Sequence, residues 1–258
     1  MSLPASSTGQ TDAVSAKNGG THAATLRLAL LGHGRMAREV ERLASQRGFE
    51  VRLILTSASN ADGAAIREEA FSDIDVCVDF TNGAAVVPNL RRIGELRKPV
   101  VVGTTGWNDR LGEAREIVGQ SGIGFVYGAN FSIGVQVLMQ LVRAAAERFS
   151  KLKLFAPYLV ETHHQFKKDA PSGTALELAR RAQPWIEPAT LPITSVRAGY
   201  FPGTHEFGWD AEAETVVLQH TARSRQAFAE GALYAARWIA GRQGFFHFSE
   251  ILNLQEES

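Results

Sequence analysis

The sequence predicts an α/β fold, with a Rossmann-type doubly wound parallel sheet followed by a smaller α+β domain. Short apolar segments alternate with helical segments through the first half of the chain, which is typical of a parallel sheet. A Gly-x-Gly-x-x-Ala turn joins the first of these strands to the first helix. Beyond residue 131 the alternation gives way to a long amphipathic helix and glycine-punctuated strands.

Composition limits the classes of protein that the chain can belong to. It has 258 residues, 45% hydrophobic and 21% charged, as expected for an ordinary globular protein of one or two domains. The formal net charge is zero, so nothing indicates a nucleic acid or a membrane surface as partner, and no apolar run has the length of a membrane span. The single cysteine, Cys77, excludes a disulfide within the chain, and its apolar neighbours predict a buried strand thiol.

Residues 1–24 contain mostly Ser, Thr, Gly, Ala and Asn and almost no large apolar side chains. Such a segment cannot bury enough surface to offset its chain entropy, so we expect a disordered tail. It lacks the apolar region of a secretory signal and the arginines of a transit peptide. A cytoplasmic location is therefore the expectation.

The first strand and the turn after it predict a dinucleotide site. Leu26–Leu31 is an apolar strand, and a helix is expected from about Arg35 to Gln46. Gly32 allows the tight turn, Gly34 lets the backbone approach a pyrophosphate, and Ala37 permits close packing of helix on strand. The predicted coenzyme residues of this loop are Gly32, Gly34, Arg35 and Met36.

The second strand, Val51 to Thr56, bears on the choice of coenzyme. An acid that would hold an adenosine ribose is absent from its end, where Thr56 and Ser57 stand instead. With no carboxylate to repel a 2′-phosphate, the pattern favours NADPH, although no arginine is adjacent either. NADH and NADPH both stay open.

The chain then continues to alternate between strands and helices. Strands are predicted at Asp75–Phe80, Pro99–Val102 and Gly124–Tyr127, with helices around Val86–Leu96 and Leu111–Gln120. Glycine and hydroxyl residues follow the strand ends in the segments Asp79-Phe80-Thr81, Gly103-Thr104-Thr105-Gly106 and Gly128-Ala129-Asn130-Phe131-Ser132. Ligands of doubly wound sheets bind at the carboxyl ends of strands, so we expect these loops to share one coenzyme cleft.

The second half predicts a different architecture. A long helix is expected over Val135–Phe149, a strand over Leu152–Val160, a helix over Ala175–Trp185, antiparallel strands over Ile193–Arg197 and Thr215–His220, and a final helix over Gly231–Ile239. The expected division is 25–130 for the dinucleotide, 131–225 for the substrate and 226–258 as a C-terminal segment.

The segment from Glu161 to Thr174 carries the strongest indication of chemistry. It places His163 and His164 side by side, Lys167 just beyond them, and a Pro-Ser-Gly-Thr turn after that. Two protonatable rings beside a cation suit a dianionic substrate that is gripped and then protonated. The helix start offers N–H groups to a carboxylate, and Thr174 with Glu177 predicts a capping box there.

A metal site is the main alternative for the two histidines. Adjacent residues point to opposite sides of a strand, and no third ligand is spaced for zinc. We therefore expect no metal.

This segment closely resembles the His-His-x-x-Lys-x-Asp-Ala-Pro-Ser-Gly-Thr-Ala motif of the dihydrodipicolinate reductases, the 4-hydroxy-tetrahydrodipicolinate reductases of the diaminopimelate and lysine pathway. The Gly-x-Gly-x-Met loop and the Asp-Phe-Thr and Gly-Thr-Thr-Gly motifs match the family in the same order, and Asn130-Phe131-Ser132 then matches the end of the family's Ala-x-Asn-Phe-Ser motif. The resemblance covers about Leu26 to Leu254. It implies reduction of 4-hydroxy-tetrahydrodipicolinate, or of its dehydrated form, by NADPH or NADH. It also implies a homotetramer, with the smaller domain as the substrate and oligomerisation domain, and the return of residues 226–258 to the dinucleotide-binding domain.

The resemblance and the chemistry of the residues together suggest roles. His163 is expected to be the general acid and Lys167 to stabilise charge on the substrate. The expected contacts of the dicarboxylate substrate are His164, Ser172, Gly173, Thr174 and Thr105. The family implies that Gly103, Thr104 and Thr105 line the nicotinamide side, and that Gly128, Ala129, Asn130 and Phe131 form the other wall.

Other interpretations remain open. A diaminopimelate or aspartate dehydrogenase, or a non-catalytic dinucleotide-sensing protein, would share the glycine loop without the His-His-Lys segment. The connections Trp185–Leu191 and Thr56–Phe71 are shorter than is common in the family, which puts oligomer and adenosine contacts in doubt. By composition alone, His205 and Arg225 could be surface residues.

Overall fold

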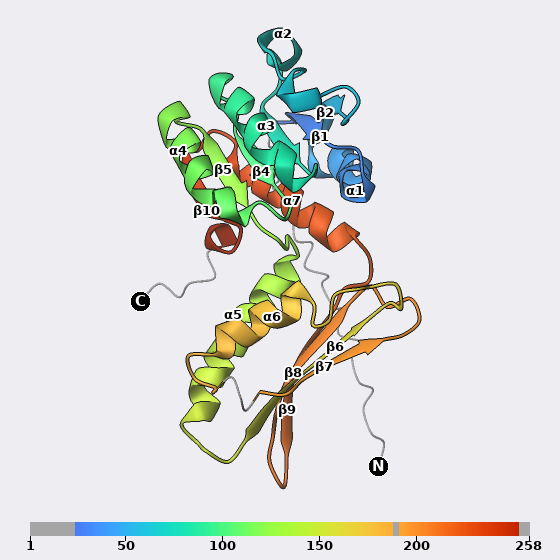
Figure 1. Ribbon diagram of the computed structural model, residues 1–258, viewed down its shortest axis with the longest axis vertical. Coiled ribbons are helices and arrows are strands. Elements are labelled where there is room, and N and C mark those ends of the chain that lie inside the picture. The colour runs from blue at the N-terminus through green and yellow to red at the C-terminus, as the bar shows by residue number, and fades with distance from the viewer. Residues whose placement is uncertain (1–23, 188–190, 253–258) are drawn as a thin grey trace, which may run out of the picture.

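The computed structural model describes residues 24–187 and 191–252, and the predicted tail lies outside these ranges except for Ala24. Two sheets form the cores of two regions, one above the other in Figure 1. The first sheet contains β1 (Leu26–Leu31), β2 (Phe49–Leu55), β3 (Val76–Asp79), β4 (Val100–Val102), β5 (Gly124–Tyr127) and β10 (Gly244–His247). Its helices are α1 (Arg35–Ala44), α2 (Glu68–Phe71), α3 (Gly83–Glu95), α4 (Leu111–Ser121) and α7 (Gln226–Ile239).

The first sheet has the strand order β10-β5-β4-β3-β1-β2, and every adjacent pair is parallel. The chain runs outward from β1 to β2 and then returns to the other side of β1 for β3. This reversal is the switch point at which doubly wound sheets bind ligands. The predicted Rossmann-type sheet is confirmed, although β10 was not predicted.

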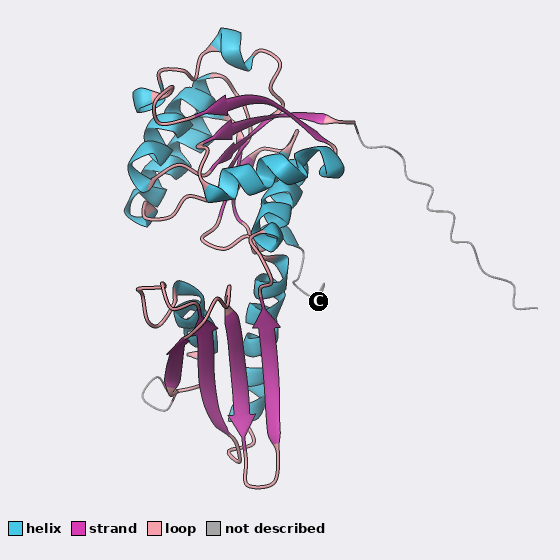
Figure 2. Cartoon of the chain, turned by 90° about the vertical axis from the view of Figure 1, so that its right-hand side faces the viewer, coloured by secondary structure: helices cyan, strands magenta, loops and turns pink. Residues whose placement is uncertain are grey.

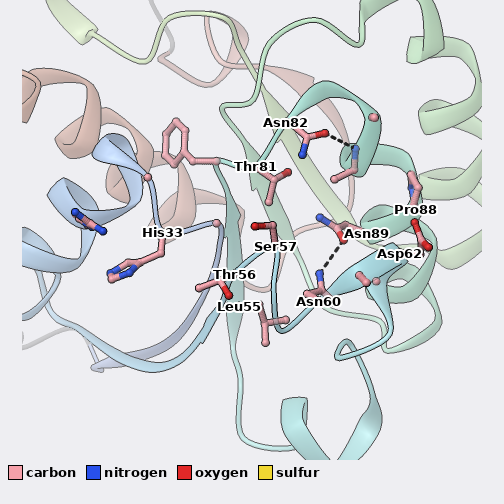
Figure 3. A pocket seen from close by; sticks show the side chains of 18 residues that line it. His33, Leu55, Thr56, Ser57, Asn60, Asp62, Thr81, Asn82, Pro88 and Asn89 are labelled. Carbon is pink, nitrogen blue, oxygen red and sulfur yellow. Dashed lines mark hydrogen bonds between the residues drawn. The ribbon is translucent and has the colours of Figure 1, made fainter.

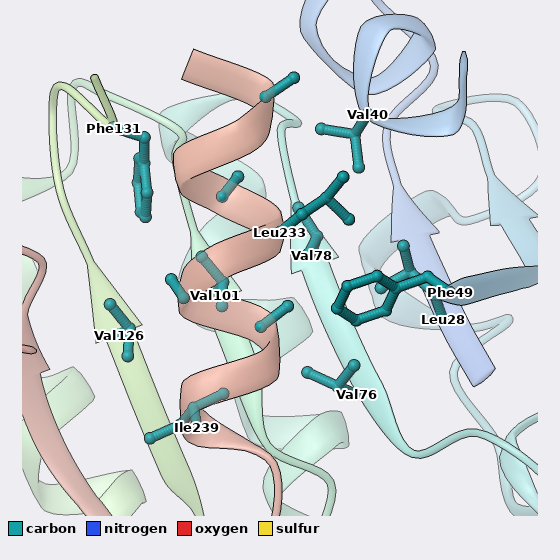
Figure 4. Packing of buried hydrophobic residues seen from close by; sticks show 14 of the residues in the cluster. Leu28, Val40, Phe49, Val76, Val78, Val101, Val126, Phe131, Leu233 and Ile239 are labelled. Carbon is teal, nitrogen blue, oxygen red and sulfur yellow. The ribbon is translucent and has the colours of Figure 1, made fainter. Parts of the chain in front are cut away.

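Alternate residues of the buried strands face opposite sides of this sheet. In β1, Leu28 and Leu30 pack against α1 and α7, whereas Ala29 and Leu31 pack against the α3 and α4 side. Figure 4 shows α7 lying across the strands, with Leu233 and Ile239 among the strand side chains. The C-terminal helix is therefore part of the core of the first sheet.

The second sheet contains β6 (Ala156–His163), β7 (Ile193–Arg197), β8 (Thr204–Asp210) and β9 (Thr215–Thr221), in the order β7-β6-β8-β9. The helices α5 (Ile133–Ser150) and α6 (Gly173–Ala182) cover one face, and Figure 2 shows the strands with these helices behind them. Leu159, Phe207 and Trp209 are buried beneath the helices. The predicted α+β region is confirmed.

Several local predictions for this region were wrong. The strand expected from Leu152 starts at Ala156 and continues to His163, so it includes Glu161. The strand Ile193–Arg197 pairs with β6 in parallel, not antiparallel. Gly208 does not punctuate strands but lies inside β8, where Tyr158 packs over it.

The predicted capping box at Thr174 and Glu177 was also wrong. The N-cap of α6 is Ser172, whose Oγ accepts a hydrogen bond from the N–H of Ala175 at 3.1 Å. Glu177 instead pairs with Arg180 and Arg181 one turn further on. Serine is as good a cap as threonine, so the helix simply begins earlier than the pattern indicated.

Candidate functional site

The glycine loop after β1 borders a large cavity at the switch point of the first sheet. Gly32 has φ +91°, and a Cβ at this position would lie 2.4 Å from the backbone oxygen of Phe80, so only glycine fits. The cavity has a volume of about 640 Å³. Among the predicted coenzyme residues, it is lined by Gly32, Gly34, Thr56 and Ser57. Figure 3 shows Thr56, Ser57 and Thr81 around this space.

Sequence reasoning missed several other residues of this cavity. His33 and Arg38 line it from the α1 side, and Asn60 and Asp62 from the loop after β2. Helical periodicity is a signal for Arg38, because it lies one helical turn after Gly34 and its backbone N–H bonds to the carbonyl of that glycine. Residues one turn apart lie on the same side of a helix. The cavity therefore has an arginine, supplied by α1 and not by the end of β2.

Asp79 connects the loops that border the large cavity. Its carboxylate is buried at the end of β3 and accepts hydrogen bonds from the backbone and hydroxyl of Thr81, at 2.9 and 2.6 Å. Thr104 donates to it at 2.9 Å and Asn89 at 3.0 Å, and Asn89 in turn accepts from Asn60. Asp79 thus joins the loops after β3 and β4, and Asn89 joins the loop after β2 to it. Burial raises the pKa of Asp79.

A second cavity of about 110 Å³ lies at the ends of β4 and β5. It is lined by the predicted residues Thr104, Thr105, Gly128 and Ala129, together with Trp107, Asn108, Leu111, Tyr127 and His247. His247 comes from β10, which the sequence did not predict. Its Nδ1 lies 2.8 Å from the Oγ of Ser249, and burial lowers the pKa of His247.

The remaining predicted coenzyme residues do not line these two cavities. Arg35 is exposed at the start of α1, while Met36 packs against the hydrophobic core. Gly103 lies under the ring of Phe80, since a Cβ there would be 2.1 Å from that ring. Phe131 is buried with its ring centroid 4.5 Å from that of Phe248.

Asn130 connects the two regions of the molecule. Its Nδ2 donates to the Oγ1 of Thr174 at 3.2 Å, and its Oδ1 accepts from the N–H of Ser132. The loop after β5 therefore contacts the first turn of α6. The structure brings a predicted coenzyme residue against a predicted substrate residue.

The interior of the second sheet changes from apolar to polar toward this contact. On the helix-facing side of β6, Leu159 is followed by Glu161 and then by His163, with one residue between each pair. Glu161 is fully buried, although carboxylates rarely are. Its Oε1 accepts from the N–H of Ser172 at 2.9 Å and from Arg197 at 2.7 Å. Burial by itself would raise the pKa of Glu161, but the hydrogen bonds lower it to about 2.

His163 lies beside this carboxylate, with its Nδ1 3.2 Å from the Oε2 of Glu161. Its ring is only 7% exposed. Burial lowers the pKa of His163, and the nearby cations Lys167 and Arg197 act in the same direction, while Glu161 opposes them.

His205 is a functional candidate that composition did not single out. It is 5% exposed, and its ring centroid lies 5.1 Å from that of His163. Its Nε2 is 3.1 Å from the Oγ of Ser172, and burial followed by the proximity of His163 lowers its pKa to about 4. The alternation of His205, Phe207 and Trp209 was a signal for one buried strand face.

His164 and Lys167 lie in the loop after β6. The backbone N–H of His164 donates to the carbonyl of Phe201 at 2.8 Å, so its position is tied to the loop after β7. The Nζ of Lys167 lies 2.8 Å from both oxygens of Asp169. That ion pair holds the ammonium close to the start of α6, where an anionic ligand could compete for it.

The start of α6 combines a buried cap with two backbone donors. Ser172 is 3% exposed and its hydroxyl is engaged by Ala175 and His205. The N–H groups of Gly173 and Thr174 precede the first hydrogen bond of the helix. A helix N-terminus of this kind suits a carboxylate.

Glu161, His163 and His205 also form a group whose ligand-type atoms all lie within 4.8 Å of one another. The sequence-based reason for discounting a metal, that a third ligand is lacking, is therefore wrong about the geometry. The charges of the site do not favour a dication, because Arg197 already balances the carboxylate and Lys167 lies nearby.

Comparison with known proteins gives matches along most of the chain. Residues 26–131 match the family described as dihydrodipicolinate reductase, N-terminus, and residues 134–252 match dihydrodipicolinate reductase, C-terminus. A 4-hydroxy-tetrahydrodipicolinate reductase of Christiangramia forsetii is 32% identical over 88% of this chain and 98% of its own. The protein of that name from Zymomonas mobilis is 32% identical over 91% of this chain and 100% of its own.

A solved structure has the same fold. The dipicolinate-bound dihydrodipicolinate reductase from Paenisporosarcina sp. TG-14 superposes with a TM-score of 0.74 at 21% identity, covering 88% of this chain and 99% of its own. Within the described residues, no helix has the length and apolar character needed to cross a membrane. The family matches and the two relatives together show that the chain belongs to the 4-hydroxy-tetrahydrodipicolinate reductase family.

Proposed function

We propose that the chain reduces 4-hydroxy-tetrahydrodipicolinate, or the dihydrodipicolinate formed by loss of water, to tetrahydrodipicolinate at the junction of its two regions. Family membership makes it an NAD(P)H-dependent oxidoreductase of the diaminopimelate and lysine pathway. The observation that carries the assignment is the hydrogen bond from Asn130 to Thr174, which joins the coenzyme loops to the His-His-Lys segment. The alternatives, an amino-acid dehydrogenase or a sensing protein, do not account for that segment.

The cavity at the switch point fits a dinucleotide. It is bordered by the glycine loop and by neutral hydroxyl side chains, and glycine is required at position 32 for the backbone to pass. The coenzyme supplies the hydride, and the protein supplies orientation, charge and a proton. In this proposal residues 25–130 and 226–258 hold the coenzyme, whereas residues 131–225 hold the substrate.

His163 is the proposed proton donor. Reduction of the conjugated imine at ring C4 leaves an enamine that needs a proton, and an imidazolium is an acid that can deliver it. Lys167 stabilises negative charge on the substrate, and its ammonium is paired with Asp169 in the loop that leads to α6. His164, Gly173, Thr174 and Thr105 hold the two carboxylates, and Ser172 acts mainly by fixing the helix start that presents them.

Both coenzymes fit this proposal, with NADPH used at least as well as NADH. Thr56 and Ser57 offer neutral donors, and Arg38 lines the same cavity as a cation for a 2′-phosphate. Asp62 also lines it, but Figure 3 shows Asp62 beside Pro88, away from His33. The phosphate is therefore expected on the α1 side.

We also propose a homotetramer, in line with the family resemblance. The face of the second sheet opposite α5 and α6 is not covered within the described chain (Figure 2), and Val217 on β9 is 43% exposed. Light scattering coupled to size-exclusion chromatography measures the subunit number. A monomer at enzyme concentrations used in assays would contradict this part.

The reaction is tested with freshly generated substrate and each coenzyme. Substrate-dependent oxidation of NADPH and NADH at 340 nm (the nicotinamide absorbance), with tetrahydrodipicolinate as product, is expected. Purified, folded protein that binds coenzyme yet shows no substrate-dependent oxidation would overturn the proposed function.

A further inference from the structure

Glu161 lies on β6, the middle one of three neighbouring strands in the second sheet. It lies opposite Ser195 of β7 on one side and His205 of β8 on the other. Glu161, Ser195 and His205 all face the helices, directly beyond the apolar layer formed by Leu159 and Phe207. A buried carboxylate in such a place needs partners for both of its oxygens.

The two oxygens of Glu161 have different partners. Oε1 accepts three hydrogen bonds, from the N–H of Ser172 at 2.9 Å, the hydroxyl of Ser195 at 2.7 Å and Arg197 at 2.7 Å. Oε2 accepts no hydrogen bond within the described residues and faces two imidazoles, with the Nδ1 of His163, which also has no hydrogen-bond partner, at 3.2 Å and the Nε2 of His205 at 3.7 Å. The structural bonds are therefore concentrated on one oxygen, and the other oxygen is left for the rings.

The second nitrogen of His163 is kept accessible by a glycine. A Cβ at Gly203 would lie 3.0 Å from the Nε2 of His163, and Gly203 has φ +155°, which favours glycine. The Nδ1 atom of His163 faces Glu161, and a side chain at position 203 would crowd Nε2. Of the two ring nitrogens, Nε2 is therefore the one that faces away from the carboxylate.

We propose that Glu161 is the positioning residue of the reaction, which holds the Nδ1–H of His163 so that Nε2 delivers the proton from a stabilised imidazolium. This inference rests on the proposed role of His163 as proton donor. It follows the general arrangement in which a buried carboxylate orients an imidazole and stabilises its charged form. Glu161 contacts no reacting atom and acts only through His163.

Charged and titratable groups surround His163 on β6, on the loop after β6, and on the neighbouring strands β7 and β8. Glu161 is on β6, Lys167 and Asp169 follow β6, Arg197 is on β7 and His205 is on β8. Burial, Lys167 and Arg197 all lower the pKa of His163, and Glu161 is the buried group that raises it. Without Glu161, His163 would lose its proton at a lower pH.

His205 supports this arrangement without competing for charge. Its pKa is lowered to about 4, so near neutral pH it is uncharged, and it bonds to Ser172. The charge of Oε2 is then directed to His163, the nearer of the two rings.

The test is Glu161→Gln, which preserves the shape and removes the charge. Activity requires the protonated ring, so it falls as pH rises through the pKa of His163 in the complex. We expect kcat to fall about a hundredfold and the alkaline limb of the kcat profile to move about one pH unit lower. NMR titration of the His163 imidazole in the full-length enzyme with bound coenzyme should show the same downward shift, and coenzyme affinity should be unchanged.

Two further variants separate positioning from a structural role. Ser195→Ala removes one hydrogen bond from Oε1 without changing charge, so kcat should fall at most a few-fold and the limb should stay in place. Glu206→Gln removes the same charge from β8 on the opposite face of the sheet, where Glu206 bonds to Tyr158, and should move neither the limb nor the titration.

An alkaline limb and a His163 titration that are the same in Glu161→Gln as in the native enzyme would overturn the inference. His163→Ala distinguishes this failure from failure of the proposed function. If that variant is inactive while Glu161→Gln titrates normally, only the inference fails. If His163→Ala retains full activity, the proton-donor role itself fails.

Discussion

The two regions of the molecule each bury a carboxylate at the end of a strand, and the two carboxylates behave in opposite ways. Asp79 ends β3, and its donors in the described chain, Thr81, Asn89 and Thr104, are all neutral, so burial prevails and raises its pKa. Glu161 lies near the end of β6 with Arg197 beside it, and its hydrogen bonds outweigh burial to lower its pKa. Burial alone thus does not decide the charge of a carboxylate; its donors do.

The difference indicates different tasks. Asp79 joins the loops that surround the coenzyme cavity, so it acts through loop geometry. Glu161 holds a negative charge beside the His163 imidazole, and in the proposed reaction it acts on proton transfer. In the proposed function, the first region with Asp79 is the hydride side of the site, because it holds the coenzyme. The second region with Glu161 and His163 is the proton side.

The largest effect is expected on the proton side, at Lys167. Replacing Lys167 with Ala should lower kcat/KM by about a hundredfold or more, because it removes the cation that stabilises charge on the substrate. Coenzyme affinity, measured by fluorescence titration, should stay near normal. Lys168→Ala is the matched control, since this neighbour is exposed. An equal loss of coenzyme affinity would place Lys167 on the hydride side instead.

The stability of the fold should depend on pH through Glu161. Its pKa lies near 2 in the folded chain against 4.5 for the ordinary group, so its ionised form contributes stability at neutral pH that is lost as pH falls through that range. The contribution is about 3 kcal/mol. Urea unfolding at a series of pH values should show Glu161→Gln less stable than the native chain at pH 7 and nearly equal to it at about pH 2.

The stability contributed by Asp79 should change with pH in the opposite direction to that contributed by Glu161. Its folded pKa is raised above 3.8, so its contribution is fully present below that pH and declines as pH rises through the raised pKa. If the difference in unfolding free energy between Glu161→Gln and the native chain does not change with pH, the two carboxylates do not differ in this way.

A smaller effect is expected from Asp79→Asn, on coenzyme binding. The amide cannot accept all the hydrogen bonds from Thr81, Thr104 and Asn89, so the loops should loosen and KM for the coenzyme should rise about tenfold. The alkaline limb of the pH profile should not move. Asp75→Asn is the control, because this residue precedes β3 and pairs with Arg27. A shifted limb in Asp79→Asn would show that both carboxylates influence the proton.

The smallest effect concerns the choice of coenzyme. Arg38→Ala should lower kcat/KM for NADPH relative to NADH by about fivefold to tenfold, and Ser57→Asp should shift the preference the same way by repelling a 2′-phosphate. Arg35→Ala provides the contrast, because Arg35 is an arginine of the same helix that does not line the cavity. A larger effect at Arg35 than at Arg38 would support the assignment from the family motif.

Local patterns predicted much of the fold. The strands Leu26–Leu31 and Gly124–Tyr127 have the predicted bounds, because short apolar runs bounded by glycine specify buried strands by themselves. Strand pairing was harder. The parallel contact of β7 with β6 and the presence of β8 depend on residues far apart in the chain, and Gly208 within β8 resembles a turn signal.

The candidate site was predictable where its residues are contiguous. His163, Lys167 and Ser172 lie in one segment, so the sequence alone groups them, whereas Glu161 acquires its partners only through the cross-strand register with Ser195 and His205. Arg38 and His247 were missed because a cavity, not a motif, brings them to the coenzyme loops.

The measurement that tests the central claim most directly is chemical rescue of His163→Ala. If the second sheet supplies the proton, this variant should lose at least about a hundredfold in kcat while binding coenzyme normally. Added imidazole should restore part of the rate, in proportion to its protonated fraction as pH is varied. Full activity in the variant, or rescue that follows the neutral form of imidazole, would contradict the account.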